Sequence, residues 1–470
     1  MAGGGCPRGV GRLILDASSL ETLLVVALVA AIAPMLVAAL PERWRVPQVV
    51  VLIFSGILIG PHVLGLSETS SVKLLANIGL GFLFLLAGYE LDLRLLAAHE
   101  GRLAMIGWVV SAVISLVAVA GLTKAGFVRD FIPIALALTT TALGTLLPIL
   151  SDNEMLRGQF GRYVLAAGAV GELFPIVAIS LFLTKRDEFA AIASLVAIAV
   201  SAVLLTMLPR IIGDERVQAI IRQGQRATAQ TTLRWSVVLL LGLLALAERF
   251  GLDVVLGAVL AGMVLRTWLR REDVDVHPLE EKLDAVGYGI FIPVFFVTSG
   301  MTLDVPAMVK DPLRVLIFLG LLLVVRGLPS LIVYRRSLPR LQRVEMTFIT
   351  ATTLPLLIAL AEIGLQDGVM LPANAAAMVG AGVLSVLIYP AVAVGLARRE
   401  RWETESAGAI TASAGEPGVA TAADGAWGAD GPLGAEGAPG ADGARGAATS
   451  LGTPAGPGAD GSSRAPGRSP

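Results

Sequence analysis

The chain has 470 residues, of which 55% are hydrophobic and 16% are charged, and its mean hydropathy is +0.77. Soluble domains carry about 25% charged residues, so this composition excludes an ordinary soluble globular protein. The net charge of −1 gives no general attraction to nucleic acid, and a single cysteine, Cys6, excludes an internal disulfide.

Apolar runs of membrane-spanning length recur along most of the chain. A transmembrane helix needs about 17 to 25 apolar residues, whereas a membrane barrel shows short alternating segments. We expect about thirteen spans, at residues 20–40, 46–62, 72–88, 103–122, 131–150, 163–184, 189–208, 235–248, 252–268, 285–301, 313–334, 344–363 and 370–397. The sequence therefore predicts an all-α polytopic membrane protein, embedded in a lipid bilayer.

Arginine and lysine are concentrated in alternate short loops. The richer set includes the loops at 210–234, 266–282 and 335–343, and the intervening loops carry fewer basic residues. Because basic loops stay on the cytoplasmic side, this bias places the N-terminus outside and the C-terminus in the cytoplasm of a cell membrane. Termini on opposite sides agree with an odd number of spans.

We divide the chain into an N-terminal segment at 1–19, a membrane domain at 20–397 and a tail at 398–470. The first span is too long for a signal-peptide core and no clear cleavage site follows it, so we expect it to be retained. The tail is rich in Gly, Ala and Pro and has little to bury, which predicts disorder. Its glycines recur every third residue at 425–446, but this run is short and poor in proline, which favours a low-complexity tail over a triple helix.

Two spans share an unusual pattern of threonines followed by a proline. The fifth contains "LALTTTALGTLLPIL" at 136–150 and the twelfth contains "FITATTLPLLIAL" at 348–360. An offset of seven spans reverses the direction of the chain, so a repeat of this kind is an inverted repeat. Paired interrupted helices in two halves of a chain are a pointer to a transporter binding site.

The residue types explain why both spans would be interrupted. Threonine hydroxyls compete for backbone groups, and proline removes a donor and clashes with the preceding turn. Two proline-kinked helices that bind nothing are the alternative, but the pairing and the glutamate on the span after the fifth favour interrupted helices. The residues concerned are Thr139, Thr140, Thr141, Pro148, Thr350, Thr352, Thr353 and Pro355.

Two charged residues lie deep inside apolar spans, Glu172 in "AAGAVGELFPI" and Arg326 in "LVVRGLPSLIVY". A carboxylate at membrane depth is costly and is by default a functional residue. Arg326 is equally compatible with a structural ion pair or helix-end charge and with a role in transport. Other carboxylates, Glu90 and Glu362 among them, lie near span ends, where solvated or capping roles are expected.

No cluster of His, Cys, Asp and Glu has the spacing of a metal site, and no phosphate loop or nucleophile elbow occurs. We therefore expect no enzyme activity, no cofactor, and no metal beyond a transported ion.

Five segments, in order, resemble those of the monovalent cation:proton antiporters, the sodium/proton exchanger superfamily, including Kef-type potassium efflux proteins. They are "FLLAGYELDL", "TTTALGTLLPILSD", "AAGAVGELFPI", "GLDVVLGAVLAGMVL" and "PVFFVTSGMTLD". The resemblance covers about residues 20–397. It implies a homodimer in which a mobile part of each protomer contains two crossing interrupted helices and carries the ion site between the two sides.

The resemblance also implies roles for individual residues. Glu172 matches the acid that binds cation or proton, Thr140 and Thr141 match the interrupted helix facing it, and Arg326 falls where electrogenic members carry a lysine. The sequence departs from the family at Gly171, where many members have a first acid. Kef-type proteins also carry a nucleotide-binding domain, and we expect none in the Gly/Ala/Pro-rich segment that follows the membrane domain here.

These observations predict exchange of Na⁺ or K⁺ for a proton, with Glu172 holding one or the other. Gly171 cannot titrate and arginine does not lose its proton, so we expect electroneutral 1:1 exchange. A Kef-like potassium efflux channel or transporter and an organic-anion carrier on the same fold are the alternatives.

Overall fold

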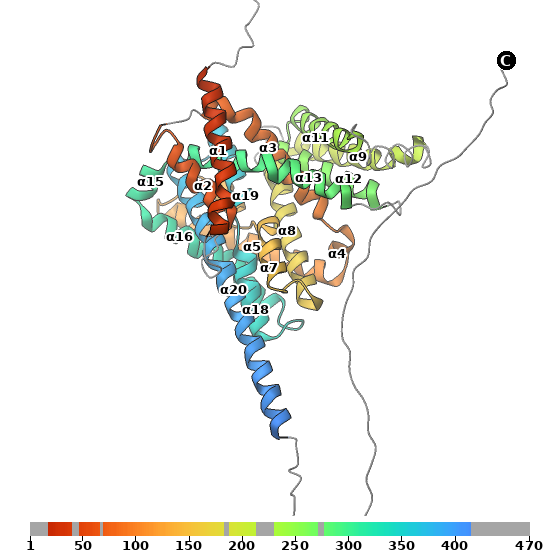
Figure 1. Ribbon diagram of the computed structural model, residues 1–470, viewed down its shortest axis with the longest axis vertical. Coiled ribbons are helices and arrows are strands. Elements are labelled where there is room, and N and C mark those ends of the chain that lie inside the picture. Colours follow the sequence, from red (N-terminus) through yellow and green to blue (C-terminus); the bar gives the residue numbers. More distant parts are fainter. Residues whose placement is uncertain are drawn as a thin grey trace, which may run out of the picture. The chain divides into compact units, whose positions relative to one another are not determined.

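The computed structural model describes residues 17–39, 47–65, 69–182, 188–212, 230–270 and 277–414. In these ranges the chain is helical and contains no strand (Figure 1). The helices are α1 (Ala17–Ala39), α2 (Gln48–Ile59), α3 (Thr69–Glu90), α4 (Leu93–Ala97), α5 (His99–Lys124), α6 (Phe131–Ala137), α7 (Leu143–Asp152), α8 (Gly158–Phe182), α9 (Glu188–Ile212), α11 (Thr231–Arg249), α12 (Val254–Arg270), α13 (His277–Val286), α14 (Ile292–Thr302), α15 (Val305–Lys310), α16 (Pro312–Leu322), α17 (Pro329–Val333), α18 (Arg340–Ala351), α19 (Pro355–Gln366) and α20 (Pro372–Ala414), with π-helical turns η2 (Gly287–Phe291) and η3 (Leu323–Gly327).

The helices account for all thirteen predicted spans. Among the described residues, ten helical segments are long and apolar enough to cross a membrane, and three shorter apolar helices, α2, α7 and α12, supply the rest. The fifth span is divided between α6 and α7, and the twelfth between α18 and α19. The prediction of an all-α polytopic fold with two interrupted helices is confirmed.

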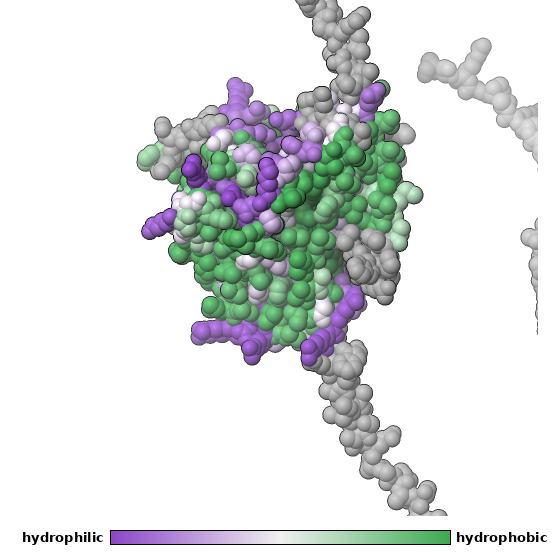
Figure 2. Space-filling view, turned by 90° about the vertical axis from the view of Figure 1, so that its left-hand side faces the viewer, coloured by the Kyte–Doolittle hydropathy of each residue, from purple (hydrophilic) through white to green (hydrophobic). Residues whose placement is uncertain are grey.

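The surface of the helical part is that of a protein surrounded by lipid. In α5 the small residues Gly107, Ser111 and Ser115 are buried, whereas the large residues Val113 and Val117 are exposed. This inside-out pattern is expected in a bilayer, where close packing of small residues, not apolar burial, brings helices together. Figure 2 shows the result as a hydrophobic band between hydrophilic residues at the two ends.

The helices pack as two groups, which we call the first and second bundles. The first bundle contains α1, α2, α3, α9, α11, α12, α13 and α14, and the second contains α5 to α8 and α16 to α20. In the first bundle, α2 and α14 approach so closely that a Cβ on Gly56 would lie 2.1 Å from the carbonyl oxygen of Val297. Helices α8, α9 and α12 pack across the boundary.

One end of the second bundle is held by a buried polar network. The Asp130 carboxylate, just before α6, accepts hydrogen bonds from the Asn374 side chain (2.7 Å) and the Leu371 backbone (2.8 Å). Arg314 of α16 donates to the Asn374 amide oxygen at 2.8 Å. The network fixes where α6, and therefore the interrupted fifth span, enters the bundle.

The last helix, α20, continues to Ala414, past the boundary that the sequence suggested at residue 398. The chain divides into units at 1–411 and 412–470. The predicted tail beyond Ala414 and most of the N-terminal segment at 1–19 lie outside the described residues.

Candidate functional site

The breaks in the fifth and twelfth spans meet in the middle of the second bundle. Thr140 and Thr353 share a hydrogen bond between their hydroxyls at 2.6 Å. The Thr141 hydroxyl donates to the Thr350 carbonyl at 2.7 Å, and the Ala142 N–H donates to the Thr352 carbonyl at 2.9 Å. The predicted threonine clusters therefore hold two non-helical stretches against each other.

The helix ends at these breaks follow from the local sequence. Pro355 is the first residue of α19, a position where proline's missing N–H costs nothing. In the fifth span the break comes earlier, at residues 138–142, and Pro148 lies within α7. The three threonines, and not this proline, mark the interruption.

Non-helical backbone at membrane depth must be satisfied by protein or water. The Thr141 N–H donates to the Gly171 carbonyl of α8 at 3.0 Å, in addition to the bonds between the two breaks. The Thr353 N–H donates to the Ser385 hydroxyl of α20 at 3.2 Å. The break is thus a fixed element of the fold.

Glu172 lies at the start of α7, where the interrupted span becomes helical again. Its Oε1 accepts the backbone N–H of Leu143 at 2.7 Å and that of Gly144 at 3.3 Å. The first N–H groups of a helix have no partner within it and carry partial positive charge, so they favour an anion. Glu172 is about 15 Å from the end of α8, near mid-membrane, and is 8% exposed.

Arg326 lies beside Gly171, the residue before Glu172. Its guanidinium donates to the Thr141 hydroxyl (2.9 Å) and the Ala167 carbonyl (3.0 Å), and within the described residues it forms no ion pair. A Cβ on Gly171 would lie 2.6 Å from both Arg326 Nη2 and Thr141 Oγ1. The guanidinium thus fills the space that a side chain at position 171 would occupy. Arg326 belongs to η3, and π-helical turns are frequent at functional sites.

A cavity of about 300 Å³, which we call the inner cavity, reaches Glu172 between the two bundles. The first bundle contributes Glu90 and Tyr288 to its lining, and the second contributes Gly144, Thr145 and Glu172. Glu90, which the sequence assigned to solvent or a cap, therefore faces the same cavity as Glu172. Its position as the last residue of an apolar span, inside a family segment, is the signal that could have identified it.

The sequence assigned Thr140 and Thr141 to the ion. In the structure their hydroxyls are engaged between the two breaks and with Arg326. The threonine that lines the inner cavity is Thr145, whose hydroxyl donates to the Ala142 carbonyl at 3.2 Å. The backbone donors of Leu143 and Gly144 had no signal in the sequence, because any residue supplies an N–H.

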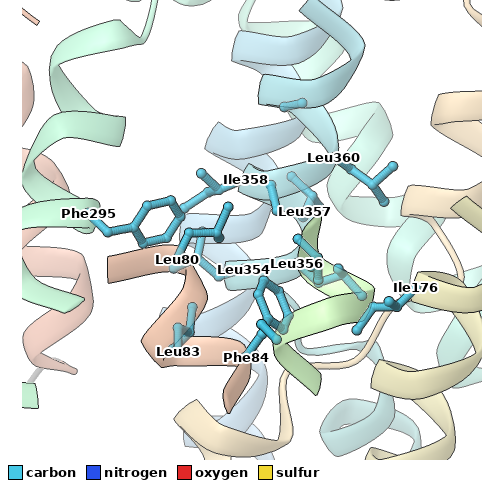
Figure 3. Close-up of a cluster of buried hydrophobic side chains, with 14 of the residues drawn as sticks. Leu80, Leu83, Phe84, Ile176, Phe295, Leu354, Leu356, Leu357, Ile358 and Leu360 are labelled. Atoms are coloured by element: carbon cyan, nitrogen blue, oxygen red, sulfur yellow. The ribbon is translucent and has the colours of Figure 1, made fainter. Parts of the chain in front are cut away.

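A second cavity, which we call the outer cavity, has a volume of about 240 Å³ and opens between the bundles toward the other end of α3. Both cavities are lined in part by one cluster of buried hydrophobic side chains, which we call the apolar barrier (Figure 3). Leu83, Phe84 and Leu356 line the inner cavity, whereas Phe295 and Ile358 line the outer one. All five belong to one cluster of buried hydrophobic side chains.

Comparison with known proteins gives a consistent result. The model of a family described as "Sodium/hydrogen exchanger, transmembrane" matches residues 16–398. A putative Na⁺/H⁺ antiporter of Bacillus subtilis is 26% identical over 83% of this chain and 65% of its own length. The Na⁺/H⁺ antiporter NhaS5 of Synechocystis is 30% identical over 60% of this chain and 40% of its own length.

The glutathione-regulated potassium-efflux protein KefC of Escherichia coli is 26% identical over 79% of this chain and 60% of its own length. The chain thus spans between two fifths and two thirds of the length of these relatives. The solved structure of the sodium proton antiporter MjNhaP1 from Methanocaldococcus jannaschii has the same fold, with a TM-score of 0.59 at 18% identity. The structural match covers 80% of this chain and 95% of the MjNhaP1 chain.

The contact between Gly171 and Arg326 gives a testable prediction. Gly171→Ala adds a Cβ that meets Thr141 and Arg326, so the break must shift, and we expect about 1–3 kcal/mol of destabilisation. The apparent unfolding temperature of the detergent-purified protein, followed by tryptophan fluorescence, measures it. Gly121→Ala is the control, because a Cβ there has no neighbour within 4 Å. Equal unfolding temperatures for the two variants would contradict the packing of Arg326 against Gly171.

Proposed function

Because the chain belongs to the sodium/hydrogen exchanger family, we propose that it exchanges a monovalent cation, Na⁺ or K⁺, for a proton across the cell membrane. Glu172 is the shared site. The observation that carries this proposal is a membrane-depth carboxylate at the start of a half-helix, within a cavity between two bundles.

The exchange follows from competition for one carboxylate. Two backbone donors occupy Oε1 of Glu172, which leaves Oε2 for a proton or a cation. A bound cation would take further oxygens from Thr145 and water, with Thr140 and Thr141 holding the break on which this geometry depends. The proton and the cation each neutralise the Glu172 charge, and only one of them can bind at a time.

The two bundles provide the movement. An uncompensated carboxylate is costly to move past the apolar barrier, so the second bundle crosses only when Glu172 carries a proton or a cation. The inner cavity lies at the end where α3 stops and α2 begins, the side to which the basic loops belong. By the positive-inside rule this is the cytoplasm, and the outer cavity faces outside.

The alternatives have less support. A Kef-like channel needs a continuous polar path, and the apolar barrier interrupts it. An organic-anion carrier needs a cation in the cavity, whereas Arg326 is 3% exposed and bonded to Thr141 and Ala167. The homodimer remains a prediction from the family resemblance.

Stoichiometry follows from the same residues. A second proton per cycle needs a second titrating group that moves with Glu172, whereas Glu90, which faces the same cavity, belongs to the first bundle. Gly171 has no side chain, and the guanidinium that replaces it in space does not release its proton. One carboxylate therefore exchanges one proton for one monovalent cation.

We expect Glu172→Gln to fold and insert but not to exchange. The amide oxygen can still accept the Leu143 and Gly144 N–H groups, but the side chain holds neither a proton nor a cation. Glu172→Ala should also be inactive, and Glu172→Asp should retain some transport with altered cation affinity. Cation-driven proton movement in proteoliposomes, read with a pH-sensitive dye, is the measurement. Glu100→Gln, a partly buried glutamate paired with Arg162, is the control. Wild-type turnover in Glu172→Ala would show that the site assignment is wrong.

Exchange should not depend on membrane potential. Proteoliposomes clamped with valinomycin and potassium, while sodium drives exchange, should show the same rate at every imposed potential. Recordings on solid-supported membranes should show no sustained transport current. A rate that follows the potential would require a second proton carrier, with Glu90 the first residue to replace.

A further inference from the structure

The inner cavity offers oxygen atoms from both bundles and no basic side chain. The polar side chains in its lining are Gln48, Glu90, Thr145, Glu172 and Tyr288, and among the described residues that line it none is Lys, Arg or His. The proposed exchange gives no role to Glu90 and Tyr288, which lie on the first bundle. A second carboxylate in a cavity without a basic side chain favours a cation over an anion.

Glu90 faces the inner cavity without a bonded partner. It is exposed at the end of α3, and its carboxylate forms no hydrogen bond or ion pair within the described residues. Arg266 of α12 is close enough to act on it electrostatically. The Arg266 guanidinium is directed elsewhere, however: it donates to the Tyr89 carbonyl and lies 3.9 Å from the Asp92 carboxylate. The Glu90 carboxylate is therefore available to an ion that enters the cavity from water.

Tyr288 is fixed to the first bundle by the packing of η2 against α3. In this contact the Phe291 ring stacks on the Phe82 ring, with 5.1 Å between their centroids. Tyr288 itself is 44% exposed and lines the inner cavity, and its hydroxyl forms no hydrogen bond within the described residues. Glu90 and Glu172 are both close enough to act on it electrostatically. The π-helical turn, a feature frequent at functional sites, thus presents a neutral oxygen near two carboxylates.

We propose that Glu90 and Tyr288 form the first-bundle half of the cation site, which is complete only while Glu172 faces the inner cavity. Glu90 supplies a second negative charge to the incoming hydrated cation, and Tyr288 supplies a neutral oxygen. Both stay behind when the second bundle moves, so the cation leaves with Glu172 as a neutral pair. The proposal rests on the proposed exchange function and adds to it a tighter binding of the cation from the cytoplasm than from outside.

The test is the apparent KM for the cation at each face of the membrane, measured in right-side-out and in everted vesicles. Sodium or potassium is used, whichever drives exchange in the wild type, at an alkaline pH at which protons no longer compete with the cation. Glu90→Gln should raise KM about threefold at the cytoplasmic face, which everted vesicles expose, and leave it unchanged at the other. Tyr288→Phe should cause a smaller rise at the same face, and Glu90→Asp should restore most of the affinity. Maximal rates should stay near wild type, because Glu172 is intact.

Two variants of the first bundle are matched controls. Asp284→Asn removes a carboxylate that is near Glu90 but does not line the cavity. Tyr89→Phe removes a hydroxyl that donates to Glu280 at 3.0 Å and does not line the cavity either.

Effects of the two controls as large as those of Glu90→Gln and Tyr288→Phe would assign the change to general charge and packing, and would overturn the proposal. An unchanged KM for Glu90→Gln at both faces, or an equal change at both, would also overturn it. A wild-type protein without cation-driven proton movement would instead refute the exchange function itself.

Discussion

The hydrogen bonds from the Leu143 and Gly144 N–H groups to Glu172 are the interaction on which the rest of the site depends. A carboxylate is tolerated at this depth because a helix begins beside it and offers unpaired donors. That helix begins there because three threonines interrupt the fifth span, and the interruption is stable because the twelfth span has one too. The two paired breaks, the start of α7 and the buried carboxylate thus depend on one another.

Under the proposed exchange function, the cost of burying the Glu172 charge is what couples the two ions. Glu172 belongs to the second bundle but lines a cavity whose other wall is the first bundle, so any relative movement carries the carboxylate along the apolar barrier. In the proposed mechanism this charge is neutralised before the movement, either by a proton or by a cation. Arg326, packed against Gly171, secures the break without entering the cavity.

The sequence predicted the spans, the two interruptions and the burial of Glu172, because each produces a local signal: an apolar run, a threonine cluster, a lone charge. It did not predict that Glu90 and Glu362 line cavities, because both lie at span ends and only the packing of two bundles shows what faces them. The fit of Arg326 against Gly171 joins residues far apart in the chain and has no local pattern. The sequence analysis counted Pro148 among the residues that interrupt the fifth span, but this proline lies within α7. The break lies at the threonines, where contacts with distant parts of the chain satisfy the backbone.

The central claim is that one carboxylate binds either the proton or the cation, and the pH dependence of the apparent KM for the cation tests it most directly. In proteoliposomes at zero membrane potential, KM should reach a constant value at alkaline pH and rise about tenfold for each unit of acidification beyond the titration of the site. The maximal rate at saturating cation should stay unchanged. A KM that does not vary with pH while the maximal rate falls would contradict the account, because it would place the proton and the cation on separate groups.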